Sequence, residues 1–173
     1  MAHPQPTLHT SEGNIHLMTT IPQIQGKQYI EDPSLAKFGQ RVRRDKNIET
    51  GKAEIGYMLV FPNISQTTGA KCVKCSALVK HFSGYDFVIQ ISGEMWDMLD
   101  QTTREILLWH QLLHVDATFK TKTQEWSYTV RKHDYADFYE INEKVGNTWY
   151  KTIQATISSL YDLDPKKESK VKV

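Results

Sequence analysis

The most regular pattern of apolar and polar residues lies in the middle of the chain. Residues 85–92 alternate apolar and polar positions as a strand does, with a glycine on either side. Residues 102–118 then carry apolar side chains around most of a helical circumference, which is typical of a buried helix. Thr102 and Glu105 have the spacing of a capping box, so the pattern predicts that this helix begins at Thr102.

Weaker patterns predict the other elements. These are a helix over 34–46, a strand over 53–61, a helix over 70–82, a short helical turn over 94–99, a strand over 126–131, and a helical region from 138 to 160 that is interrupted at Gly146. We therefore expect an α+β fold. A small mixed sheet, built from the strands near Ile55, Phe87 and Tyr128, would pack against helix 102–118, with helices completing the C-terminal part.

The length of 173 residues allows one domain with a substantial core. Residues 1–33 contain four prolines without a sustained period, so they are predicted to be irregular apart from a short strand near 15–18. Residues 34–164 form the predicted domain. Residues 165–173 follow as a charged, disordered tail.

Charge and composition exclude few classes of protein. The net charge is +1, which disfavours a general attraction to nucleic acid or membranes. No apolar run has transmembrane length, and no signal peptide is recognisable, so the expected location is the cytosol. Cys72 and Cys75 form a C-x-x-C pair, which three interpretations fit: small hydrophobic residues, a redox pair, or part of a metal site.

The chemistry of the chain centres on His110 and His114. Residues four apart on a helix share a face, so the two imidazoles could occupy two corners of a tetrahedral zinc site. Metallohydrolases use this spacing as H-E-x-x-H, but here Gln111 stands at the position of the Glu. The alternative is a pair of core histidines that hydrogen-bond to carbonyl groups or water.

A zinc site on one helix needs at least one further ligand from elsewhere in the chain. His133 is the candidate, because it lies between a predicted strand and a predicted helix just after the histidine pair. Asp134, Asp137 and Glu140 follow closely, either as alternative ligands or as acceptors that orient a histidine ring.

Four motifs in order resemble the phage metallopeptidase family, which is itself similar to the zincin-like SprT proteins. They are the segment 84–89, Trp96-Asp97, the H-x-x-x-H helix, and the segment 131–134 leading to Phe138. The resemblance covers about residues 55–146. It implies a zincin-like fold, zinc held by His110, His114 and His133, a peptide or protein substrate, and, for a phage-encoded protein, the cytosol of the host cell.

The chain departs from the family at Gln111, where the resemblance implies a general base. That Glu takes a proton from the water that zinc acidifies and passes it to the leaving amine, which a carboxamide cannot do. Losing a general base costs about 10²- to 10⁴-fold in rate, so we expect the chain as written to be nearly inactive. Gln111 is either an introduced Glu→Gln change that traps an inactive form or the natural residue of a pseudo-enzyme.

Two functions other than peptide hydrolysis remain open. A catalytically dead metalloprotein could bind a protein partner in the groove that zincin-like domains have between the sheet and the active-site helix. A nucleic-acid-associated protein is the other alternative, because Arg41, Arg43 and Arg44 form a basic spot, although the near-neutral net charge disfavours it.

Overall fold

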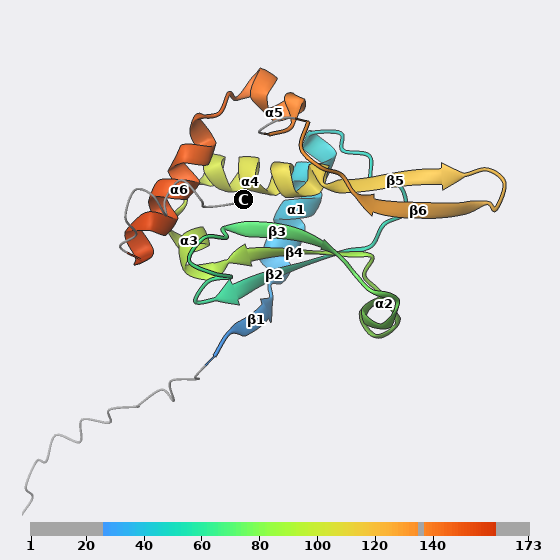
Figure 1. The fold of residues 1–173 in the computed structure, drawn as a ribbon, viewed down its shortest axis with the longest axis horizontal. Helices are drawn as coiled ribbons and strands as arrows, with labels where there is room; N and C mark the ends of the chain where they lie inside the picture. The colour runs from blue at the N-terminus through green and yellow to red at the C-terminus, as the bar shows by residue number, and fades with distance from the viewer. Residues whose placement is uncertain (1–25, 135–136, 162–173) are drawn as a thin grey trace, which may run out of the picture.

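The computed structural model describes residues 26–134 and 137–161 (Figure 1). This part of the chain forms a four-stranded sheet, a separate two-stranded hairpin and six helices. It is the α+β fold that the sequence predicts, with a small sheet packed on the helix that carries the histidine pair. The predicted strand near 15–18 and the predicted tail over 165–173 lie outside the described residues.

The sheet has the strand order β1-β2-β4-β3. Its strands are β1 (Gln28–Glu31), β2 (Ile55–Phe61), β3 (Ala70–Lys74) and β4 (Phe87–Ser92). The two central strands, β2 and β4, are parallel, and they are rich in buried apolar residues because both are covered by neighbouring elements. The edge strands β1 and β3 are antiparallel to the strands they pair with.

Helices α1 (Pro33–Asp45) and α4 (Gln101–Leu113) pack against each other and against the sheet. Gly39 of α1 lies against Tyr57 of β2, where an added Cβ would come within 2.2 Å of the tyrosine ring. The glycine therefore allows the close approach of α1 to the sheet. The remaining helices are α2 (Ala77–Ser83), α3 (Gly93–Met98), α5 (Tyr139–Lys144) and α6 (Thr148–Tyr161).

One hydrophobic core joins these helices to the sheet. Its fully buried members come from every layer: Ile89, Ile91, Met95, Leu107, Leu108, Leu112, Phe138, Ile141 and Ile153. Every residue of α4 from Ile106 to Leu113 is buried, as its apolar circumference predicts. The histidine pair therefore lies on the most enclosed helix of the fold. No helix in the described ranges combines the length and the hydropathy that crossing a membrane requires.

The predicted helix over 70–82 is wrong in its first half. Residues Ala70–Lys74 form strand β3, which pairs with β4, and Ser76 then caps the shorter helix α2 through a hydrogen bond from the Val79 amide. The helical spacing of apolar residues across this segment came from two different elements. Hydrogen bonding to β4, a partner distant in the sequence, decided the conformation of the first one.

Both predicted ends of the helix over 102–118 are also wrong. Its N-cap is Asp100, whose carboxylate accepts from the Thr103 amide, rather than Thr102. The helix ends at Leu113, and β5 (Val115–Lys120) follows and pairs with β6 (Glu125–Val130). The strand that contains Tyr128 therefore belongs to this hairpin and not to the main sheet (Figure 1).

Strand β1 lies inside the segment that was predicted to be irregular. Its side chains are mostly exposed, so it has no buried apolar face that the sequence could reveal. It is held by backbone pairing with β2. The predictions of α1, β2, β4, β6, the short helical turn of α3 and the two C-terminal helices separated near Gly146 are confirmed.

Candidate metal centre

Three histidines meet beside the C-terminal end of α4. His110 is in the last turn of the helix, His114 is its C-cap, and His133 lies in the segment after β6. The Nε2 atom of His133 is 3.1 Å from Nε2 of His110 and 3.2 Å from Nε2 of His114. The group is the one that the sequence predicted, and its three ligand atoms lie within 4.8 Å of one another.

The opposite nitrogen of each helix histidine is already engaged. The Nδ1 atom of His110 is 2.8 Å from a carboxylate oxygen of Asp137, and Nδ1 of His114 is 2.7 Å from the carbonyl oxygen of Arg131. Both oxygens only accept hydrogen bonds, so each Nδ1 carries the proton in the neutral ring. The Nε2 lone pairs of both rings are therefore free to bind a metal ion.

Asp137 is the acceptor that fixes the ring of His110. It also accepts hydrogen bonds from the Phe138 amide at 2.7 Å and from the Trp149 indole nitrogen at 3.2 Å. Burial raises the pKa of Asp137, but the hydrogen bonds and the proximity of His110 outweigh this effect and lower it below its usual value. An ionised carboxylate behind a metal-binding histidine holds the tautomer and raises the basicity of the ring.

Arg131 connects the hairpin to the segment that carries His133. Its amide donates to the His114 carbonyl at 2.8 Å, so backbone and side chain of His114 both bond to this one residue. Its guanidinium binds Glu140 and Asp134, each at 2.9 Å, and lies 4.8 Å from the centre of the Phe138 ring. Through these contacts the residues on either side of His133, Arg131 before it and Asp134 after it, are linked to Glu140 of α5.

The surroundings of His114 and His133 favour the neutral form of their rings. The Phe138 ring is fully buried and lies within 5.3 Å of all three imidazole rings, centre to centre. Burial lowers the pKa of His114 to about 4 and, together with the neighbouring His110, lowers the pKa of His133. Neutral imidazole is the form that binds a metal ion, so these pKa shifts favour a metal site at neutral pH.

The observed spacing also fits a metal ion. Zinc–nitrogen bonds of about 2.0–2.1 Å in tetrahedral geometry place two ligand nitrogens about 3.3 Å apart. The two separations from His133, 3.1 and 3.2 Å, are close to that value, and all three nitrogens lie within 4.8 Å of one another. A single N–H on His133 Nε2 cannot fully satisfy the lone pairs of both His110 and His114, whereas one cation can bind all three rings.

Gln111 has an unusual environment for an amide. Its side chain is fully buried, and neither Oε1 nor Nε2 has a hydrogen-bond partner among the described residues. A buried amide without partners costs about 1–3 kcal/mol for each unsatisfied group. The residue at the position of the general base therefore offers a donor and an acceptor that the fold itself does not use.

Sequence reasoning found the three histidines but not all of their partners. Of the three acidic candidates, Asp137 bonds to a histidine, whereas Asp134 and Glu140 pair with Arg131. Two contacts were missed: the Arg131 carbonyl that bonds to His114, and the Trp149 indole that donates to Asp137 behind His110. A backbone carbonyl leaves no trace in a sequence, and Trp149 lies at an ordinary core position of a helix.

Cys72 and Cys75 are free thiols that do not belong to the histidine group. Cys72 is on β3, where burial raises its pKa to about 12. Burial also raises the pKa of Cys75. A thiol with a raised pKa is a poor nucleophile at neutral pH, so the structure favours the simplest of the three interpretations, small residues that pack.

The α+β fold and a helix-borne histidine group that could hold a metal ion define a protein of the metallopeptidase-like class. Residues 27–161 match the family model described as "Putative phage metallopeptidase", and the chain belongs to that family. The match begins at β1 and ends at α6, so it includes every helix and strand of the structure. No curated protein and no solved structure matches the chain.

Proposed function

We propose that the protein is a zinc-dependent metallopeptidase-type protein whose catalysis is blocked at Gln111. The observation that carries the proposal is the convergence of three imidazole Nε2 atoms, with the rings of His110 and His114 held from behind by oxygen acceptors. Zinc is the metal of choice for a site of imidazole ligands in tetrahedral spacing.

His110, His114 and His133 would hold the ion, with Asp137 and the Arg131 carbonyl orienting two of the rings. When bound, zinc supplies a Lewis acid that polarises a peptide carbonyl and makes water more acidic. The residue at position 111 would have to accept a proton and deliver it to the leaving amine. Gln111 can hydrogen-bond to substrate or water, but it cannot move that proton.

Strand β3 supports a peptide or protein as the substrate. It is the edge strand of the sheet on the side that packs against α4, and the described residues add no further strand to its outer edge. An extended peptide can pair with such an edge through main-chain hydrogen bonds, which give affinity without strong sequence selectivity. A substrate strand paired with β3 would run beside α4, which packs against this strand.

The first test is the metal content of the protein purified without chelator. We expect about one zinc ion per chain in the wild type and a loss of bound zinc in His110→Ala. His81→Ala, on the exposed helix α2, is the matched control and should retain the metal. A wild-type protein that holds no zinc after incubation with the ion would refute the proposal.

The second test restores the base. Gln111→Glu should raise cleavage of a mixed peptide library by about 10²- to 10⁴-fold over the wild type, with zinc bound in both. Gln111→Leu is the control, because leucine fills a similar space without a group that accepts a proton. This variant should stay inactive. The gain should disappear when zinc is removed with a chelator.

Gln111 also favours a second function, a metal-binding module that holds a protein partner without cutting it. Its buried, uncharged amide can donate and accept hydrogen bonds but cannot serve as the general base. If Gln111→Glu binds zinc yet cleaves no peptide, while the unsubstituted protein retains a protein partner, the binding function replaces the hydrolytic one.

A further inference from the structure

A second pocket lies at the other end of α4, away from the histidines. It is a cavity of about 410 Å³ between α1 on one side and α3 and the start of α4 on the other. Its lining consists of Asp32, Ser34, Leu35, Lys37, Phe38, Arg41, Trp96, Gln101 and Arg104. None of these residues belongs to the metal centre, so the pocket is a separate feature of the fold.

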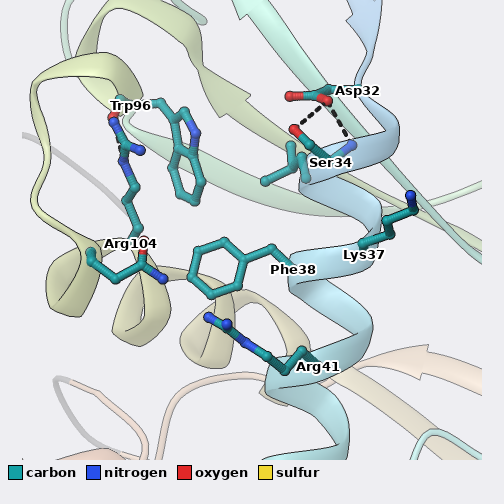
Figure 2. A pocket seen from close by; sticks show the side chains of 9 residues that line it. Asp32, Ser34, Lys37, Phe38, Arg41, Trp96 and Arg104 are labelled. Carbon is teal, nitrogen blue, oxygen red and sulfur yellow. Dashed lines mark hydrogen bonds between the residues drawn. The ribbon is translucent and has the colours of Figure 1, made fainter.

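Each arginine of the pocket lies over an aromatic ring. The guanidinium of Arg104 is 5.1 Å from the centre of the Trp96 ring, and that of Arg41 is 4.6 Å from the centre of the Phe38 ring. The two rings contact each other, with centres 6.1 Å apart. Figure 2 shows the result, two cations arranged around a pair of contacting aromatic side chains.

This stacking orders the arginines before a ligand arrives. Arg104 also donates to the carbonyl oxygens of Trp96 at 2.9 Å and Asp97 at 3.1 Å, which uses only two of its five N–H donors. A guanidinium that is already positioned loses little side-chain entropy when it binds an anion. The pocket is thus preorganised for a planar, two-point contact with an oxyanion.

The charges of the pocket are not balanced internally. Within the described part of the chain, no carboxylate forms an ion pair with Lys37, Arg41 or Arg104. Asp32 is the single carboxylate of the lining. It accepts from the amide and hydroxyl of Ser34, and these bonds outweigh its burial and lower its pKa. Three cations against one carboxylate leave a formal charge of +2.

The formal charge of +2 on the lining favours one class of oxyanion over another. A carboxylate carries one negative charge, whereas a phosphate monoester carries about −1.5 to −2 at neutral pH and has three strong acceptor oxygens. The monoester therefore matches the +2 of the lining more closely. The cavity is also larger than a phosphate group, and the Leu35 and Phe38 side chains provide an apolar wall for whatever carries it.

We propose that this pocket binds a small phosphate monoester. Arg41 holds the phosphate, Lys37 and Arg104 add to the positive field, and an apolar portion of the ligand lies against Phe38. Asp32 and Ser34 lie at the end of the pocket opposite Arg41 (Figure 2), where they can bind a hydroxyl or amino group of the ligand. This site is independent of the metal centre and of its proposed chemistry.

The test uses phenyl phosphate as the probe, titrated into the full chain by calorimetry and by the NMR shift of the Trp96 indole N–H, identified with Trp96→Phe. We expect saturable binding that weakens as salt rises, and a weaker response to benzoate and to phenol. Equal affinity for benzoate would overturn the assignment to phosphate. Absence of binding would overturn the proposal altogether.

Three variants locate the site. Arg41→Gln should weaken phenyl phosphate binding by about 10- to 100-fold, because a charged hydrogen-bond donor is lost, and Lys37→Gln should weaken it less. Arg44→Gln, an exposed arginine on the same helix outside the pocket, is the matched control and should bind within about twofold of the wild type. If Arg41→Gln does not weaken the binding of phenyl phosphate, this pocket is not the binding site.

Two further arms exclude other origins of the signal. His133→Ala should leave phenyl phosphate binding unchanged, whereas loss of binding in that variant would assign the phosphate to the metal centre and overturn the proposal. A single-stranded oligonucleotide without terminal phosphates should bind no better than phenol. If it binds while phenyl phosphate does not, the pocket recognises a polynucleotide and the assignment to a small monoester is wrong.

Discussion

The two ends of α4 carry polar side chains in opposite electrostatic states. At the C-terminal end, His110 is buried, His114 and His133 are half-buried, and burial depresses the pKa values of His114 and His133. At the N-terminal end, Arg104 and Arg41 line one open pocket, each with its guanidinium over an aromatic ring. One helix of 13 residues thus presents neutral lone pairs at one end and permanent cations at the other.

Burial explains this difference. Imidazole titrates near neutrality, so an enclosed environment converts it to the neutral form that binds cations. Guanidinium does not lose its proton in proteins, so it must stay near solvent or meet an anion. The same helix can therefore hold a metal ion at its enclosed end and an oxyanion at its open end. The following predictions test whether the two ends act independently.

The largest effect is expected from loss of a histidine of the group. His133→Ala should lower zinc affinity by more than about 100-fold, because a direct ligand is lost and substituting even an outer partner costs about 10- to 100-fold. Competition with a chromophoric chelator measures the affinity. His81→Ala is the matched control, and a His133→Ala protein with wild-type zinc affinity would remove His133 from the site.

Asp137→Asn should have the next largest effect. The amide keeps the shape of the side chain but loses the charge that stabilises the His110 ring, so zinc affinity should fall by about 10- to 100-fold. Asp97→Asn makes the same change at an exposed residue of α3, near the other end of α4, and it should leave zinc affinity unchanged. Equal losses in the two variants would indicate a general effect of charge rather than a specific hydrogen bond.

The metal-free protein should lose stability as the pH falls from about 6.5 to about 4. The pKa of His114 is about 4 in the folded chain and about 6.5 in the unfolded chain, so in this window the unfolded state binds more protons. Stability therefore rises with pH across the window. Urea unfolding at several pH values measures the slope, which should be shallower in His114→Gln than in His81→Gln.

The smallest effect is expected from the cap at the open end. Asp100→Ala removes the hydrogen bonds to the amide and hydroxyl of Thr103, and it should lower the midpoint of unfolding slightly through loss of the N-cap. Thermal or urea unfolding measures this loss. Zinc stoichiometry should not change, and a variant that loses zinc along with its cap would show that the two ends of α4 are coupled.

Local periodicity was enough to predict most of the fold. The apolar circumference of α4 and the alternation in β4 are properties of consecutive residues, and both elements exist as predicted, although the predicted ends of α4 were wrong. The spacing of His110 and His114 likewise follows from the helical repeat alone. Strands β1 and β3 were missed or misread, because pairing with a strand distant in the sequence decides their conformation. Strand β5 was read as the end of the preceding helix, although its partner β6 follows directly in a hairpin.

The candidate site divides in the same way. The sequence alone determined that two imidazoles share one face of a helix, that Gln111 follows the first, and that His133 is available nearby. Only the tertiary structure decided that His133 comes within 3.2 Å of both rings and that Asp137, not Asp134 or Glu140, fixes His110. It also brought Phe38 and Arg41 of α1 to Trp96 and Arg104. The reason is physical: helical periodicity acts between neighbouring residues, whereas these contacts join segments that only the packed core brings together.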